Sequence, residues 1–262
     1  MNNSTGYPDP QFLKDFLDEK ADLYNHIDFI ENDPIQIPHR FSLKQDIEIS
    51  GFLTATISWG TRKSIINDAE KILSWMGNSP YDFVLNFKES DMDFFKHNSV
   101  HRTFNKEDLH HFIRNLSRLY QENDSLENLF LVKENETNFY HSLHRFRTEF
   151  FKENEIHRST KHVSSTYKNS SAKRLIMFLR WMVRQDRKGV DFGIWKNIDQ
   201  KNLSIPLDVH TGNISRKLNL IYRKQNDWKT VEELDLVLRK FDDKDPAKYD
   251  FALFGLGIDK EF

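Results

Sequence analysis

The spacing of apolar residues constrains the fold of this chain more than any other feature. Two stretches, 107–120 and 139–151, carry an apolar side chain at every third or fourth residue. Side chains with this spacing share one face of an α-helix, so each stretch predicts a helix with a buried stripe. Only 9 of the 262 residues are glycine, and alternating β-branched residues are almost absent. We therefore predict an all-α fold. The stripes consist of Leu109, Phe112, Ile113, Leu116 and Leu119, and of Phe139, Leu143, Phe146 and Phe150.

The same spacing, together with capping residues, predicts the other helices. The first begins after Asp9 and buries Phe12, Phe16 and Leu17 on one face. Residues 152–171 lack periodicity, and we predict a surface connection there. Because we find neither an internal repeat nor a clear linker, we expect a single unit spanning 1–262. Further helices are predicted at about 47–57, ending near Trp59 and Gly60; at 62–76, capped by Thr61; at 172–184, capped by Ser170 or Ser171; at 209–218, capped by Asp208; at 228–241; and at 246–256.

Composition excludes several classes of protein. Apolar residues make up 38% of the chain and include 22 phenylalanines, which suits a folded domain with a large core. No apolar run approaches the ~20 residues that span a bilayer, and the N-terminal sequence MNNSTGYPDP lacks the features of a signal peptide. The absence of cysteine excludes disulfides, thiolate metal sites and iron–sulfur clusters. We expect a cytoplasmic monomer that needs neither a metal nor a cofactor.

Common catalytic motifs are missing from the sequence. It contains no P-loop, no GxGxxG and no GxSxG, which removes the main support for nucleotide-binding and serine-hydrolase functions. Several histidines occur in pairs, but none forms an HExxH or a comparable ligand set, so no metal site is predicted. These pairs are His110 and His111, His141 and His144, and His157 and His162.

Lys173 and Asp208 are the two residues that we select as candidates for chemistry. Lys173 lies in the first turn of its predicted helix, where the positive end of the helix dipole disfavours a cation and favours a nucleophilic amine. Asp208 follows Pro206 and precedes a helix, so it is predicted to be an N-cap. A carboxylate held in this way could also stabilise a developing cation. Each residue also has an ordinary explanation, as a solvated lysine and a capping aspartate.

Basic residues are concentrated on both sides of this pair, although the net charge of the chain is −2. They would form a phosphate-binding rim if they flanked one cleft, and a solvated helix face explains them equally well. Trp59, Trp181 and Trp195 are candidates for stacking on a base, although core packing is the simpler explanation for each. The basic residues, with one histidine, are Lys161, His162, Lys168, Lys173, Arg174, Arg180, Arg184, Arg187 and Lys188, followed by Arg216, Lys217, Arg223 and Lys224.

Two segments, KRLIMFLRWMV and IPLDVHTGNISRKLNL, resemble the helix-hairpin-helix DNA glycosylase superfamily, including its endonuclease III-like and archaeal 8-oxoguanine glycosylase-like members. Lys173 falls on the lysine that opens the helix after the hairpin, and Asp208 and His210 fall on a D-x-H step. DIEISGFLTATISWGTRKSIINDAEKIL resembles an early helix pair whose connecting turn approaches DNA. The chain from residue 10 to 262 more closely resembles a bacterial family defined as domain of unknown function 2400, through LRWMVR, PLDVH and KYDFALFGLG.

The superfamily resemblance implies a two-lobed helical fold with a central cleft, with a first lobe at about 40–150 and the lysine and aspartate within about 160–225. It implies a DNA repair glycosylase with Schiff-base lyase activity, in which Lys173 is the nucleophile and Asp208 stabilises positive charge on the sugar. DNA is the implied partner. The residues implied to contact it are Ser58, Trp59 and Thr61 in the early turn, Lys168, Ser170 and Arg174 around the hairpin, and His210 and Arg216 after the aspartate.

The sequence departs from the superfamily pattern in three places. YKNSSAKR stands where a glycine-rich hairpin is expected, Lys173 and Asp208 are 35 residues apart, and no cysteine cluster follows Gly257. Hairpin glycines let backbone amides approach a phosphate. Their absence leaves two other hypotheses open: a non-catalytic nucleic-acid-binding protein and a helical interaction scaffold.

Overall fold

The computed structural model describes residues 9–96 and 98–258, and it confirms the all-α prediction. Short 3₁₀ helices join the α-helices, and the described strands β1 (Ser99–His101) and β2 (Phe104–Asn105) form one small antiparallel pair. No helix in the described ranges has the length and apolar character that crossing a membrane requires. The α-helices are α1 (Pro10–Tyr24), α2 (Lys44–Thr56), α3 (Arg62–Trp75), α4 (Pro80–Asn86), α5 (Lys106–Glu122), α6 (Tyr140–Phe150), α7 (Lys173–Val183), α8 (Val209–Lys217), α9 (Trp228–Phe241) and α10 (Tyr249–Ile258).

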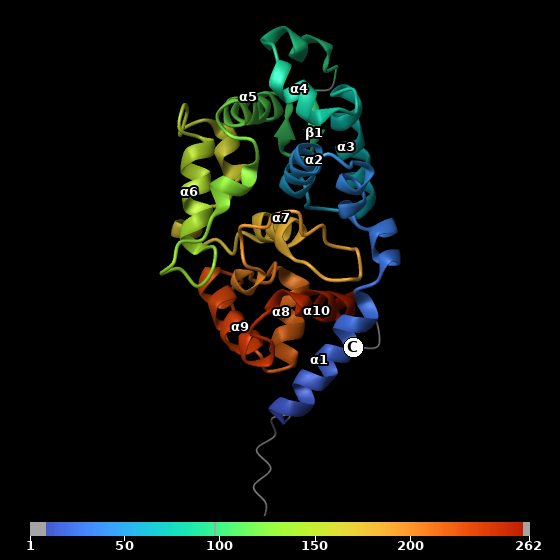
Figure 1. Cartoon of the computed structure of the whole chain (residues 1–262), viewed down its shortest axis with the longest axis vertical. Coiled ribbons are helices and arrows are strands. Elements are labelled where there is room, and N and C mark those ends of the chain that lie inside the picture. The colour runs from blue at the N-terminus through green and yellow to red at the C-terminus, as the bar shows by residue number, and fades with distance from the viewer. Residues whose placement is uncertain (1–8, 97, 259–262) are drawn as a thin grey trace, which may run out of the picture.

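The helices are arranged in an upper and a lower group with α7 between them (Figure 1). Helices α2 to α6 make up the upper group in this view, and α8, α9 and α10 make up the lower group. The chain returns on itself, because α1 packs against α10 near the other end of the sequence, and α10 also packs on α8. Helix α7 packs against α2, and its Arg180 side chain donates a hydrogen bond to Asp250 of α10, so α7 connects the two groups.

Helices α5 and α6 confirm the two apolar stripes. All nine stripe residues are at most 1% exposed. Asn105 and Asp108 form a reciprocal capping box at the start of α5, which explains why the helix begins there. The stripes meet at Phe52 of α2, whose ring lies 5.4–5.9 Å from the rings of Phe112, Phe146, Phe150 and Phe178. Phenylalanine packing therefore holds α2, α5, α6 and α7 together.

The face of α1 that is buried differs in part from the predicted one. The helix begins at Pro10 with Asp9 as its N-cap, as expected, and Leu17 is buried. Phe12, however, is 63% exposed, while Leu13 and Ala21 are buried in its place. Residues 13, 17 and 21 are four apart and so lie on one face, the face that packs on α10. The prediction for Phe12 was therefore wrong.

The approach to α7 also differs from the prediction. Residues 158–162 and 166–168 form the 3₁₀ helices η6 (Arg158–His162) and η7 (Thr166–Lys168), and several of their side chains are buried, so this is not a simple surface connection. The N-cap of α7 is Ala172, with φ of 48°, and no side chain caps the helix. The predicted serine cap was therefore wrong, although the Ser170 hydroxyl does accept a hydrogen bond from the Ala172 amide at 3.2 Å.

Candidate functional site

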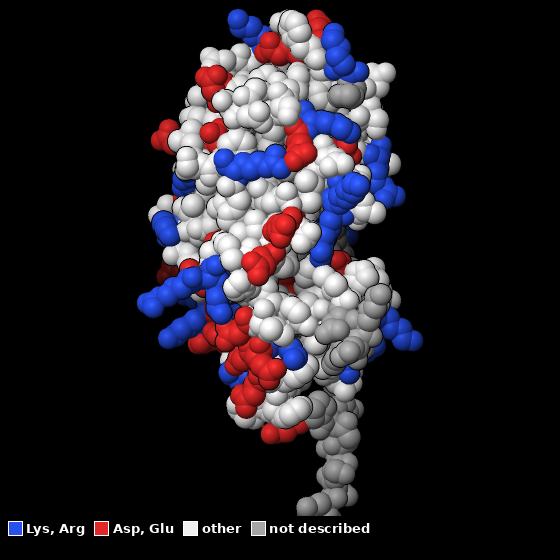
Figure 2. Space-filling model, turned by 90° about the vertical axis from the view of Figure 1, so that its right-hand side faces the viewer, with Lys and Arg blue, Asp and Glu red and all other residues white. Residues whose placement is uncertain are grey.

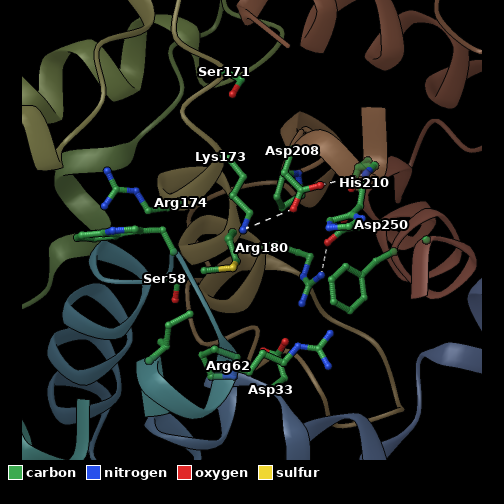
Figure 3. Close-up of a pocket in the computed structure, with 18 of the residues that line it drawn as sticks. Asp33, Ser58, Arg62, Ser171, Lys173, Arg174, Arg180, Asp208, His210 and Asp250 are labelled. Atoms are coloured by element: carbon green, nitrogen blue, oxygen red, sulfur yellow. Dashed lines mark hydrogen bonds and ion pairs between the residues drawn. The ribbon is translucent and has the colours of Figure 1, made fainter. Parts of the chain in front are cut away.

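A pocket of about 570 Å³ lies where the two groups of helices meet α7 (Figure 3). Its wall comes mainly from five segments, and Phe29, Ser164, Ser170 and Ser171 also line it. Asp33 precedes the short helix η2 (Pro34–Gln36), and Ser58 and Trp59 lie in the turn between α2 and α3. The remaining wall is supplied by α7, by Asp208 and the start of α8, and by α10. Pockets of this size commonly hold small organic ligands.

Lys173 and Asp208 face each other across this pocket. The Lys173 Nζ lies 3.7 Å from the Asp208 Oδ2, and Figure 3 shows both side chains reaching into the same space. Their side chains are 32% and 26% exposed, so both are accessible to a ligand. Asp208 is the N-cap of α8 and accepts a hydrogen bond from the Thr211 amide at 3.0 Å, which confirms its predicted capping role. This bond fixes one carboxylate oxygen, and the other faces Lys173.

One face of α7 extends along the pocket wall. Lys173, Met177, Arg180 and Trp181 all line it. Their spacing of four, three and one residues keeps them on one side of a helix, and at 1.5 Å per residue the stripe is roughly 12 Å long. Lys173 is half-buried at one end of the stripe, and Trp181 is fully buried at the other. The pocket therefore has an accessible end beside Lys173 and a buried end beside Trp181.

Trp59 and Arg174 form the wall next to Lys173. The Arg174 guanidinium lies 4.8 Å from the centre of the Trp59 ring, and it donates a hydrogen bond to the Thr56 carbonyl. Burial lowers the pKa of Arg174 to about 10. The Trp59 ring also stacks on His162, with the ring centres 5.7 Å apart. These contacts hold an aromatic surface and a cation in fixed positions beside the candidate nucleophile.

The buried end of the pocket contains acidic groups that sequence reasoning missed. Arg180 donates to Asp191 at 3.1 Å and also to Asp250, and all three side chains are buried. Burial raises the pKa of Asp250 to about 6, although the neighbouring Arg180 opposes this. Burial likewise raises the pKa of Asp33. The sequence signal for Asp250 was its position within the apolar helix YDFALFGLG, because a carboxylate is rarely buried unless it is paired.

Several basic residues do not form the predicted phosphate-binding rim. Arg184 is buried and bonded to Asp186, Asp191 and Asp245, and Arg180 is buried among aspartates. His162 is buried beside Asp108. For Arg180, Arg184 and His162 both explanations, a phosphate-binding rim and a solvated helix face, were wrong, because all three side chains are buried inside the protein. The face in Figure 2 carries acidic and basic side chains side by side, so attraction of a polyanion depends on local groups.

The remaining predicted contact residues divide into two sets. Ser58, Trp59, Ser170, Arg174 and His210 line the pocket together with Lys173 and Asp208. Thr61, Lys168 and Arg216 do not line it: Thr61 caps α3, Lys168 is exposed at the end of η7, and the Arg216 guanidinium bonds to the loop at 223–226. Trp181 and Trp195 are fully buried. Within the described ranges, no three His, Asp or Glu side chains are placed together to hold a metal ion.

Comparison with known families agrees with the closer of the two sequence resemblances. Residues 33–259, which include every pocket residue from Asp33 to Ile258, match the family described as "Protein of unknown function (DUF2400)". The chain belongs to this family. No curated protein matches the chain, and no solved structure does either. The relation to helix-hairpin-helix DNA glycosylases therefore stays a prediction.

Proposed function

We propose that this protein is a DNA N-glycosylase with lyase activity, in which Lys173 is the nucleophile and Asp208 its electrostatic partner. The observation that carries the proposal is the 3.7 Å separation of their functional atoms in one pocket. Clusters of reactive groups in a cleft are candidate active sites. The superfamily resemblance supplies the reaction class.

The chemistry requires an amine, a carboxylate and space for an extruded base. Asp208 takes a proton from the Lys173 ammonium, the resulting amine attacks C1′ of the sugar, the bond from C1′ to the base breaks, and the base departs with the electron pair and takes up the proton from Asp208. Asp208 stabilises the positive charge that develops on the sugar and accepts the proton that Nζ loses. The bond between C1′ and the ring oxygen then opens, the oxygen is protonated, and a protonated Schiff base joins Nζ to C1′.

The loop before α7 supports an approach to the DNA backbone even without glycines. Asn169 and Ala172 adopt left-handed conformations, with φ of 61° and 48°, which glycine otherwise favours. The loop is held in place because the Asn169 carbonyl accepts a hydrogen bond from the Trp228 amide at 3.2 Å. No side chain caps the first turn of α7, so its amides are not occupied by a capping group. A phosphate could bind at such a helix start.

Borohydride trapping tests the proposal. The full chain is incubated with duplexes that carry an abasic site or an oxidised purine, and borohydride reduces any Schiff base to a stable adduct that is detected by gel shift. We expect an adduct with wild type, none with Lys173→Gln, and at least about a 100-fold slower reaction with Asp208→Asn. Lys201→Gln is the matched control, because Lys201 is exposed and pairs only with Asp199 at 3.0 Å among described residues.

Two results would overturn the assignment. An equal adduct from Lys173→Gln would exclude Lys173 as the nucleophile. No adduct on any duplex, combined with salt-sensitive binding that survives Asp208→Asn, would favour the non-catalytic nucleic-acid-binding hypothesis. If binding is also absent at low salt, the interaction-scaffold hypothesis is favoured.

A further inference from the structure

We propose that the buried end of the pocket reads the hydrogen-bonding edge of a guanine-type base, with Asp33 accepting its N–H groups and the Trp181 indole donating to its carbonyl. This inference rests on the proposed function, because it takes the pocket as the place that receives an extruded base. It goes further by naming the class of base and the residues that select it.

Asp33 is a carboxylate held in place with accepting capacity to spare. One oxygen caps the short helix η2 by accepting from the Ile35 amide at 3.0 Å, and no other hydrogen bond to the Asp33 carboxylate is found among the described residues. Its side chain lines the pocket, as Figure 3 shows, and the charges of Arg62 and Arg180 act on it. A carboxylate can accept about four hydrogen bonds. A ligand that carries N–H groups would therefore find a fixed acceptor here.

Trp181 provides an independent observation, because a polar group of its side chain has no partner at this end of the pocket within the described part of the chain. It lines the pocket and is 0% exposed, and its Nε1–H has no hydrogen-bond acceptor among the described residues. A buried donor without a partner is uncommon in native structures and calls for an explanation. A ligand with an acceptor atom would satisfy it once the side chains around the buried end adjust.

The Arg180 guanidinium donates from Nε to Asp191 and from one Nη nitrogen to Asp250, so part of its donor capacity is already used. At this end Asp33 offers a carboxylate that accepts, and the Trp181 indole offers a donor. The guanine edge matches both, because N1–H and the 2-amino group form a fork like that of a guanidinium, and O6 accepts. Enzymes that extrude a base commonly read it by this edge.

Guanosine and inosine form a matched pair of probes, since inosine lacks only the 2-amino group. We would measure the binding of each to the full chain by isothermal titration calorimetry. We expect wild type to prefer guanosine by about 10- to 100-fold, the range for one hydrogen bond to a charged group, because inosine keeps the N1–H contact. In Asp33→Asn the preference should fall to about 1, because Asn keeps the capping oxygen but replaces an acceptor with a donor. In Trp181→Phe both nucleosides should bind more weakly.

Asp28→Asn is the control, since Asp28 is exposed on the neighbouring helix η1 (Ile27–Asn32) and does not line this pocket. It should keep the wild-type preference. Equal affinities for the two nucleosides in wild type, no binding of either, or an unchanged preference in Asp33→Asn would each overturn the inference. Borohydride trapping without guanosine preference would leave the proposed function standing and remove this inference. Guanosine preference without trapping would remove the proposed function and leave a pocket that binds a guanine-type base.

Discussion

Glu48 offers the sharpest test of how this fold holds its pocket in place. Its carboxylate lies on α2, is 0% exposed, and accepts four hydrogen bonds. Oε2 accepts from the Tyr120 hydroxyl at 2.8 Å and the Leu126 amide at 3.1 Å. Oε1 accepts from the Trp195 indole at 2.6 Å and from the Ser125 hydroxyl. One side chain thus ties α2, which leads into the Ser58–Trp59 turn of the pocket, to three other segments.

Glu48→Gln changes this site by a single group of similar size. The amide has one oxygen and one NH₂, and a hydroxyl beside the NH₂ can rotate to accept. An N–H donor cannot do so. Whichever way the amide turns, either the Leu126 amide or the Trp195 indole faces an NH₂ and loses its acceptor. A buried unpaired donor costs about 1–3 kcal/mol, and the remaining bonds weaken because the acceptor is no longer charged.

We therefore expect Glu48→Gln to lower the free energy of unfolding by about 3 kcal/mol. Urea denaturation followed by tryptophan fluorescence measures this change. Glu89→Gln is the control, because Glu89 forms only exposed ion pairs with His110 and Arg114 among the described residues, and its replacement should change stability by less than about 0.5 kcal/mol. A loss below about 1 kcal/mol for Glu48→Gln would refute the reasoning, since it would mean that the four donors find other acceptors.

Two further predictions concern packing and pH. Gly255→Ala should lower the free energy of unfolding by at least about 3 kcal/mol in urea denaturation, because a Cβ there would lie 2.1 Å from the Tyr24 ring. Gly77→Ala should lower it by about 1 kcal/mol, because Gly77 has a φ of 65° but no atom within 4 Å of the added Cβ. A smaller loss of stability at Gly255 than at Gly77 would contradict this. Burial raises the pKa of Asp235 to about 7. Between about pH 4 and pH 7 the folded state therefore retains a proton that the unfolded state releases. The stability of wild type should fall relative to that of Asp235→Asn as the pH rises through this range. Parallel stability curves from pH 4 to 7.5 would show that Asp235 does not titrate in this way.

The helices were predictable because their signals are local. The stripe from Leu109 to Leu119 repeats within each turn of α5, and Asn105 and Asp108 cap it three residues apart. The capping role of Asp208 was predictable for the same reason, since its partner Thr211 is three residues away. The start of α7 was placed correctly but its cap was not. The conformation of that loop depends on Trp228, which is far away in the sequence.

The pocket was predictable only in part. Lys173 and Asp208 could be selected from the sequence by resemblance, but neither their separation nor their shared pocket could. Asp33 had only the signal of a chain break before Pro34, and Asp250 that of a charge in an apolar helix. Glu48 had no distinguishing signal, because it follows the polar residues at the start of α2, where a glutamate is ordinarily solvated.

The sequence by itself determined the all-α class, most of the helix positions and the apolar faces of α5 and α6. It did so because helix formation and capping depend on residues within about four positions of one another. Only the tertiary structure decided which charged groups are buried, that Arg180 and Arg184 bind aspartates inside the protein, and that Asp33, Lys173, Asp208 and Asp250 line one pocket. Such environments depend on side chains from distant segments, and the packing of α7 between the two groups of helices brings those segments together.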